Sequence, residues 1–333
     1  MNNIADLEPY ISQLAGQRVL VIGDIILDEY LFGDATRLSR EAPIPILQFR
    51  ERRHVPGGAA NPAANIARLG STAIQIGITG TDPAAQHLTD ALQQRDISPA
   101  HLTADATRPT TVKTRLMAHM GLRFPQQVAR LDTLSRTPIT PTIEQQVLTQ
   151  VERTLPPAQA VLFSDYRSGL LTPSLVAAVQ AQATANIMLT ADAQGNFGKY
   201  IGFAVVKCNA AEAATELGQP LQSDADFAHA AHTLRQRLAL TQGMVITQGA
   251  DGATVATADG TTHHCPAPAV VDVFDTVGAG DTAIAVTTLA LCAGASLPRA
   301  VTLSNYASGL VVRKVGNYAP APDELRWALQ AWA

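Results

Sequence analysis

Apolar residues fall into short continuous blocks along the chain, and most blocks are followed by a turn and a longer segment of helix-forming composition. Short apolar blocks predict buried strands, and their alternation with helices predicts a largely parallel sheet covered by helices on both faces. The predicted strands are 18–22, 73–77, 160–163, 187–191, 204–206 and 244–246, and the predicted helices are 59–69, 83–95, 173–183, 225–240 and a short helix from 210.

Two regions interrupt this alternation. Residues 34–50 and 111–132 lack helical periodicity, and 111–116 alternates between apolar and polar residues as a half-exposed strand does. The segment 127–131 is placed to pair with it across a loop at 120–125. We therefore expect one domain over residues 1–333, with these two regions added as a small β flap. Residues 253–273 also have the pattern of strands and turns.

The segment DTVGAGDT at 275–282 places two glycines and a carboxylate before an apolar run at 283–293. The length and Ala/Leu content of that run predict a buried helix, so the turn lies at its N-terminus. Free N–H groups and the helix dipole make such a turn an anion site, and Gly278 and Gly280 let a phosphate approach the backbone. A carboxylate at Asp281 suits a general base for an attacking hydroxyl, with a simple first-turn acid as the alternative.

Three further polar segments follow predicted strands or open predicted helices. PGGAAN at 56–61 is a second Gly-rich turn, NAAE at 209–212 sets an amide and a carboxylate three residues apart, and TQGADG at 247–252 follows a strand. The 209–212 pattern also fits an ordinary helix start. Asp28 and Asn61 also fit a structural role in satisfying turns.

Together with DTVGAGDT, these segments resemble the ribokinase-like (PfkB) family of sugar kinases in order and spacing over nearly the whole chain. The resemblance implies an α/β fold, a three-layer α/β/α sandwich with a mostly parallel central sheet and a small β-strand lid. It implies a kinase that uses ATP and Mg²⁺, with Asp281 as the base and the N–H groups from Val277 to Gly280 holding the γ-phosphate. The implied catalytic residues are Asp281, Gly278, Ala279 and Gly280; the implied nucleotide and Mg²⁺ residues are Asn209, Glu212 (through water), Thr247, Gly249, Gly252, Thr276 and Asn305; and the implied sugar-binding residues are Asp28, Gly57, Gly58, Asn61, Arg37, Lys113 and Arg115.

Within the family, several segments look like those of the D-glycero-β-D-manno-heptose 7-phosphate kinases. They include GDIILDEY at 23–30, RLSREAPIP at 37–45, QQ before RLD at 126–132 and FSDY at 163–166. The resemblance implies phosphorylation of the anomeric hydroxyl to a 1,7-bisphosphate, a precursor of the lipopolysaccharide core. Many bacteria fuse this kinase to an adenylyltransferase domain, and we expect the kinase half alone here. A kinase of another sugar, or a non-catalytic sugar- or nucleotide-binding homologue, is the alternative.

The chain departs from the pattern of those heptose kinases at two lysines. Ser168 stands where a lysine follows the Ser-Asp-Tyr motif, and Gln194 stands where an Asp-Pro-Lys-Gly motif has its lysine. Both changes remove positive charge near a phosphorylated ligand, although Arg167 is adjacent to the first. Arg37 and Arg40, together with Lys113 and Arg115, remain candidates for a sugar phosphate, with solvated flap residues as the alternative for the first two.

Composition excludes several other functions. The net charge of −4 and pI near 6.0 argue against nucleic acid as a main partner. The three cysteines form no CxxC pair and indicate a reducing, cytoplasmic compartment. We expect no signal peptide and no membrane span, because no suitable apolar run is present. His263, His264 and Cys265 lie in a strand-like segment without further ligands, so they predict no metal site. We expect a homodimer formed through the lid.

Overall fold

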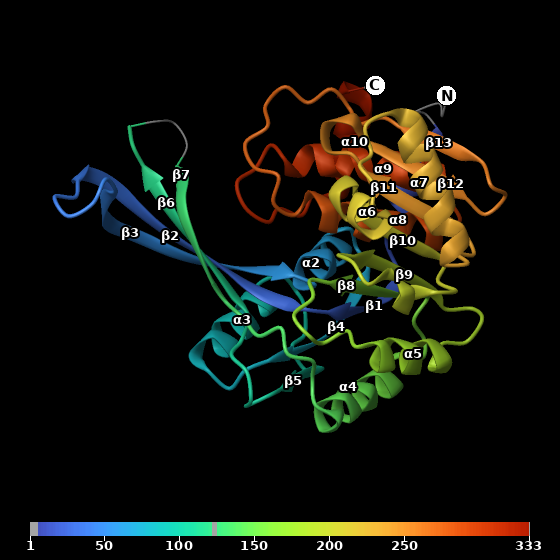
Figure 1. Cartoon of the computed structure of the whole chain (residues 1–333), viewed down its shortest axis with the longest axis horizontal. Helices are drawn as coiled ribbons and strands as arrows, with labels where there is room; N and C mark the ends of the chain where they lie inside the picture. The colour runs from blue at the N-terminus through green and yellow to red at the C-terminus, as the bar shows by residue number, and fades with distance from the viewer. Residues whose placement is uncertain (1–5, 122–124, 333) are drawn as a thin grey trace.

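The computed structural model describes residues 6–121 and 125–332, and a nine-stranded sheet forms the centre of this part of the chain (Figure 1). The strand order is β13-β12-β11-β10-β9-β8-β1-β4-β5, and only β12 and β13 run antiparallel to their neighbours. The mostly parallel sheet that the sequence predicted is therefore confirmed. Its strands are β1 (Arg18–Gly23), β4 (Thr72–Thr79), β5 (Leu102–Ala104), β8 (Ala160–Asp165), β9 (Met188–Ala193), β10 (Val205–Asn209), β11 (Gly243–Thr247), β12 (Ala253–Thr257) and β13 (Thr262–Cys265).

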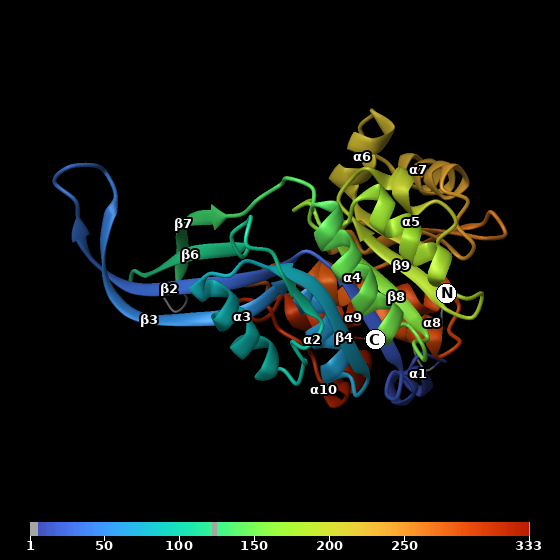
Figure 2. The ribbon, with the colours of Figure 1, turned by 90° about the horizontal axis from the view of Figure 1, so that it is seen from below.

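Helices cover both faces of this sheet (Figure 2), and one of the two largest apolar cores lies on each face. Along β1, Leu20 and Ile22 pack into the core beneath α4, α5, α6 and α7, whereas Val19 and Val21 pack against α1, α2, α3, α8, α9 and α10. This alternation is the pleat of a strand buried on both faces. The helices are α1 (Glu8–Gln13), α2 (Ala60–Arg68), α3 (Pro83–Gln93), α4 (Pro141–Thr154), α5 (Pro173–Gln182), α6 (Ala210–Leu217), α7 (Asp224–Arg237), α8 (Ala279–Cys292), α9 (Leu297–Val311) and α10 (Pro322–Ala331).

A second, four-stranded sheet with the order β3-β2-β6-β7 projects away from the main body (Figure 1). It contains the two regions that lacked helical periodicity, but its central hairpin is longer than predicted, because β2 begins at Ile25 and β3 ends at Gly58. The first residues of β2 are apolar and buried in the main core, so in the sequence they resemble a continuation of β1. The strands are β2 (Ile25–Leu38), β3 (Pro45–Gly58), β6 (Val112–His119) and β7 (Gln126–Thr133).

The structure contains helices where the sequence interpretation had assigned no element. We assigned no element to residues 141–154 or 322–331, where α4 and α10 form. Both helices carry proline in the first turn, and the Thr140 hydroxyl caps α4 by accepting the N–H of Ile143. Residues 1–5, where we expected no signal peptide, and 122–124, within the predicted lid loop, lie outside the described residues. In the described part of the chain, none of the helices has both the length and the apolar character that a bilayer span requires.

The carboxyl ends of the parallel strands meet at one edge of the main sheet. Gly23 of β1 lies beside Ser164 of β8, Ser164 beside Asp192 of β9, and Asp192 beside Lys207 of β10. Binding sites of open α/β sheets form at this edge because the loops that follow the strands converge there. The polar segments after β8, β9, β10 and β11 are therefore brought together, although they are far apart in the sequence.

Candidate active site

The glycine turn before α8 leaves backbone N–H groups without acceptors among the described residues. Gly278 has a φ of +84°, a left-handed conformation that glycine adopts without strain, and it directly precedes the first residue of α8. The N–H of Val277 donates to Asp275 Oδ1 at 3.0 Å, so it is already used within the loop. The N–H groups of Gly278 and Gly280 have no acceptor among the described residues. These two donors, and not that of Val277, are available for a phosphate.

Asp281 lies in the first turn of α8, and its side chain is buried, with 5% exposure. One carboxylate oxygen accepts a bond from the Tyr166 hydroxyl at 2.6 Å, and the other accepts one from Asn61 Nδ2 at 2.9 Å. Burial, and next the negative charge of Asp192, raise the pKa of Asp281 to about 6, while the bonds from Tyr166 and Asn61 act in the opposite direction. A carboxylate with this pKa is ionised at neutral pH and is basic enough to accept a proton.

Replacing Tyr166 by Phe removes a bond that stabilises the ionised form of Asp281. We therefore expect the pKa of Asp281 to rise above about 6, so that the acidic limb of the kcat–pH profile moves to higher pH. Tyr200→Phe is the matched control, because its hydroxyl donates to the buried Asp165 at 2.8 Å and not to Asp281. An acidic limb that stays in place in Tyr166→Phe contradicts this coupling.

A second polar cluster is centred on Asp28, at the base of the four-stranded sheet β3-β2-β6-β7, which is the lid. Asp28 is 3% exposed, and its carboxylate forms a close ion pair with Arg115 of β6 and accepts a bond from Asn317 Nδ2 at 2.6 Å. Gly57 lies against it: a Cβ at residue 57 would be 2.0 Å from Asp28 Oδ2. The lid sheet thus brings Asp28, Gly57 and Arg115, which we assigned to sugar binding, into one place.

Lys113 and Asn317 connect this cluster to the glycine turn. Lys113 pairs with Asp28 in the sheet register, and its Nζ lies 4.9 Å from the centre of the Tyr166 ring, whose hydroxyl bonds Asp281. Asn317 bonds Asp28 on one side, and a Cβ at Gly278 would lie 2.9 Å from its Oδ1 on the other. The Asp28 cluster and the glycine turn are therefore parts of one continuous site.

Three further residues of the sugar set, Asn61, Arg37 and Gly58, lie outside this cluster. The Asn61 amide, 1% exposed, donates to Asp281, so it orients the proposed base directly. Arg37 is exposed near the far end of β2, roughly 30 Å from Asp28 along the strand. Within one chain, Arg37 therefore lies away from the Asp28 cluster. Both residues belong to β2, and the extended strand keeps them far apart along its axis. Gly58 lies against the backbone oxygen of Asp24 at the end of β3.

Asn209 and Glu212 form a reciprocal capping box at the start of α6. The Glu212 N–H donates to Asn209 Oδ1 at 2.9 Å, and the Asn209 N–H donates to Glu212 Oε2 at 2.7 Å. These two residues therefore have the geometry of an ordinary helix start, which was the alternative interpretation of the 209–212 pattern. Glu212 is half-buried, and burial raises its pKa. Only Oε2 is used by the cap, which leaves the second oxygen for a further ligand.

The other residues assigned to the nucleotide lie around the loop after β11. Thr247 ends β11, and its hydroxyl donates to the Cys208 oxygen at 3.3 Å. Gly252 closes the loop against the Cys265 oxygen, with Gly249 opening it and Thr276 exposed beside the glycine turn. The Asn305 amide is buried and donates to the oxygens of Cys265 and Pro266 at 2.8 and 3.2 Å, so it fixes the segment after β13.

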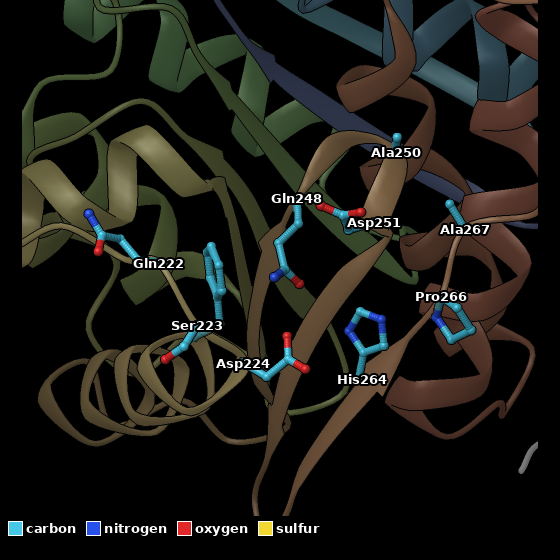
Figure 3. A pocket seen from close by; sticks show the side chains of 10 residues that line it. Gln222, Ser223, Asp224, Gln248, Ala250, Asp251, His264, Pro266 and Ala267 are labelled. Carbon is cyan, nitrogen blue, oxygen red and sulfur yellow. The ribbon is translucent and has the colours of Figure 1, made fainter.

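A pocket of about 520 Å³ opens beside this loop (Figure 3). Its walls come from the start of α7, the loop after β11 and the end of β13, with Gln248, Asp251 and His264 labelled between them. The pocket is large enough for a nucleoside and is lined by groups that donate and accept hydrogen bonds. None of the residues that we assigned to the nucleotide lines this pocket, but Gln248, Ala250 and Asp251 belong to the same 247–252 loop.

Three residues of this site had no role assigned from the sequence. Tyr166 was noted only as part of a resembling segment, and Asn317 and Lys207 were not noted at all. Lys207 of β10 is buried and donates to Asp192 Oδ2 at 2.7 Å and to the Gly280 oxygen at 3.1 Å. A lysine inside an apolar strand is the one signal that could have identified it, since buried lysines are rare unless paired.

The comparisons with known proteins agree with this geometry. The model of the pfkB family carbohydrate kinases matches residues 17–324. The chain belongs to that family. It is a carbohydrate kinase, and kinases of this family use ATP. The chain is 38% identical over 318 residues to the bifunctional protein HldE of Azorhizobium caulinodans, and 35% identical over 332 residues to that of Paramagnetospirillum magneticum. These alignments cover 95% and 99% of this chain and 65% and 66% of the two relatives, so the chain spans about two thirds of their length.

Solved structures show the same fold. Phosphofructokinase-2 from Escherichia coli in complex with substrates and products superimposes with a TM-score of 0.76 at 19% identity, covering 95% of this chain and 99% of that one. Arabidopsis thaliana ribokinase complexed with ribose and ATP gives 0.71 at 18% identity, with coverage of 95% and 99%. At these identities the comparison establishes the ribokinase-like fold, with its three layers and mostly parallel sheet, and nothing about the acceptor.

Proposed function

We propose that this kinase transfers the γ-phosphate of ATP to a sugar hydroxyl held between the Asp28 cluster and the glycine turn, with Asp281 as the general base. The observation that carries the proposal is the position of Asp281. It is a buried carboxylate with a pKa raised to about 6, and it lies in the same helical turn as two free N–H donors. A simple anion-binding loop has no use for a carboxylate there, whereas a phosphoryl-transfer site needs one beside the attacking hydroxyl.

The residues divide the reaction between them. Asp281 accepts the proton of the sugar hydroxyl, whose oxygen forms a bond to the γ-phosphorus. The bond from that phosphorus to the β–γ bridging oxygen breaks, and ADP leaves. The N–H groups of Gly278 and Gly280 hold the phosphoryl oxygens as their charge rearranges. Asn61 and Tyr166 orient the base, and the lid strands that carry Asp28 and Lys113 exclude water above the sugar.

Glu212 and the neighbouring Asn209 are the residues that fit Mg²⁺. The described residues contain no group of three or more His, Cys, Asp or Glu side chains placed to hold a metal. This agrees with an ion that keeps most of its water and is bound mainly by nucleotide phosphates, with one carboxylate acting through water. When bound, Mg²⁺ neutralises phosphate charge.

Replacing Glu212 by Gln tests this role, because glutamine preserves the capping box while removing the charge. We expect the Mg²⁺ concentration for half-maximal activity to rise by about tenfold or more. A Mg²⁺ titration of ADP release measures it, with the melting temperature as the control for folding. An unchanged Mg²⁺ requirement in a folded variant assigns Glu212 to the helix cap alone.

We propose D-glycero-D-manno-heptose 7-phosphate as the acceptor, phosphorylated at the anomeric hydroxyl. The resembling segments at 23–30 and 163–166 support this, and both lie in the site: the first carries Asp28 and the second ends at Tyr166. Lys113 and Arg115 supply positive charge near Asp28. ADP release with the heptose 7-phosphate, the free heptose and other sugar phosphates tests the assignment. Turnover with unphosphorylated sugars alone contradicts it and favours a kinase of another sugar.

We propose that two copies of the chain associate through their lids. The lid exposes large apolar side chains that a single chain leaves in water: Leu38 (69% exposed), Ile44 (57%), Phe49 (66%) and Leu131 (67%). Covering them with a second lid removes apolar area from water. We expect sedimentation at micromolar concentration to show a dimer, and Phe49→Asp together with Leu131→Asp to give a monomer. A monomeric wild type contradicts the proposal.

A further inference from the structure

Lys207 places a buried positive charge against the glycine turn. Its Nζ donates to the Gly280 oxygen at 3.1 Å and to Asp192 Oδ2 at 2.7 Å, and the residue is 5% exposed. A Cβ at residue 280 would lie 3.1 Å from this nitrogen, so the absence of a side chain at Gly280 lets the ammonium approach the first turn of α8. Of the described residues that contact this turn, Lys207 is the one that brings a full positive charge to it from the sheet.

The surroundings keep this lysine charged. The Asp192 carboxylate accepts a bond from Lys207 Nζ at 2.7 Å, which favours the ammonium form, and the charges of Asp281 and Glu212 also act on this nitrogen. The ammonium therefore lies among three carboxylates, from β9, α6 and α8. A site this rich in negative charge repels a nucleoside triphosphate unless a fixed cation offsets it.

Two other basic residues near this edge, Lys199 and Arg167, lie against other parts of the chain. Lys199 is equally buried, but its Nζ pairs with Asp165 at 2.6 Å and donates to the Leu171 oxygen at 2.8 Å. Arg167 lies beside Gly195, where a Cβ would be 3.7 Å from its Nη1. Gln194, in the turn after Asp192, carries no charge. The position of Lys207 on the adjacent strand thus supplies the charge that residue 194 lacks.

We propose that Lys207 is the positioning residue of phosphoryl transfer in this enzyme. Its ammonium fixes the peptide between Gly280 and Asp281, next to the two free N–H groups of the turn, and supplies the positive potential that holds the γ-phosphate. This inference rests on the proposed role of the glycine turn. It predicts that a lysine introduced at position 194, in the turn that follows the neighbouring strand β9, performs the same task, because Asp192 near the end of β9 pairs with Lys207 in the sheet register.

The test compares Lys207→Gln with Lys207→Gln/Gln194→Lys. We expect kcat to fall by about 100-fold in the single variant, with KM for the sugar changed by less than about threefold. We expect kcat of the double variant Lys207→Gln/Gln194→Lys to be at least about tenfold higher than that of Lys207→Gln. The assay uses whichever sugar gives the highest turnover, so an incorrect heptose assignment leaves it unaffected. A kcat within about threefold of wild type in Lys207→Gln overturns the proposal, and so does a loss that Gln194→Lys fails to recover.

Two controls separate this role from packing. Lys207→Gln leaves Asp192 buried without its partner, so Asp192→Asn/Lys207→Gln removes both charges and restores folding if the single variant is unstable. The same 100-fold loss is expected in that pair, and a wild-type kcat there overturns the proposal. Lys199→Gln removes another buried lysine. We expect it to lower the melting temperature, and we expect Gln194→Lys added to it to give no increase in kcat.

A binding measurement tests the inference independently of turnover on any sugar. Calorimetry compares ADP with a non-hydrolysable ATP analogue in the presence of Mg²⁺. If Lys207 acts on the γ-phosphate, Lys207→Gln raises the dissociation constant of the ATP analogue by about tenfold and changes that of ADP by less than about twofold. Equal weakening of both nucleotides, or of neither, contradicts the assignment even if Asp281 proves not to be the base.

Discussion

Asp281→Asn is expected to reduce kcat by about 1,000-fold or more while the protein stays folded. The amide cannot accept the proton of the sugar hydroxyl, yet it has nearly the shape of the carboxylate and can still accept the bond from Tyr166. Sugar and nucleotide binding depend on other groups, so their dissociation constants are expected to change little. ADP release and calorimetry on the same preparation measure the two quantities.

Asp281→Asn lowers kcat, but it is not expected to lower the stability of the fold. The pKa of Asp281 is raised in the folded state from an ordinary value of 3.8 to about 6, so the folded protein binds this proton more tightly than the unfolded chain. The ionised carboxylate therefore destabilises the fold above pH 6 by about 3 kcal/mol at most, a penalty that fades as the pH falls towards 4. We expect the melting temperature of Asp281→Asn near pH 8 to equal or exceed that of the wild type.

These two results together separate a catalytic role from a structural one. A first-turn acid that only caps α8 loses stability when it is replaced and has no reason to lose kcat selectively. A folded Asp281→Asn variant with wild-type turnover would falsify the proposed mechanism. A variant that is both inactive and strongly destabilised at pH 8 would instead show that the carboxylate is needed for the fold.

Asp28→Ala is expected to lower the free energy of unfolding by about 3–5 kcal/mol and to raise KM for the sugar. It leaves the Arg115 guanidinium buried, with 6% exposure, and without its carboxylate partner, which is the costly way to break a buried ion pair. It also removes the acceptor of the Asn317 amide. Urea unfolding and sugar-dependent kinetics measure the two effects.

Asp34→Ala on the same strand is the matched control. Its ion pair with Arg50 spans 3.5 Å, and the two side chains are 53% and 57% exposed, so the expected loss is below about 1 kcal/mol. Adding Arg115→Met to Asp28→Ala removes the unpaired charge and is expected to recover part of the stability, but not the KM. Equal losses in Asp28→Ala and Asp34→Ala contradict the importance of the buried pair.

Much of the fold was predictable because its signals are local. Blocks such as 18–22 and 160–163 must be buried on both sides and therefore read as strands, and β1 and β8 form there. The lid was found for the same reason, since 111–116 alternates with the period of a strand. Its hairpin was underestimated because the start of β2 is buried in the main core, so its composition there does not differ from that of β1.

Within the site, the sequence by itself determined the glycine turn, the base candidate Asp281, and the pairing of Asn209 with Glu212, since each depends on neighbours a few residues away. Only the tertiary structure decided which partners meet them. Tyr166 and Asp281 are 115 positions apart, and Asp28 and Asn317 are 289 apart, so no spacing rule relates them. Lys207 reaches Gly280 only because the carboxyl ends of parallel strands converge beneath the N-terminus of α8. Arg37 shows the converse: it has the right charge for a sugar phosphate, but the direction of β2 carries it away from the site.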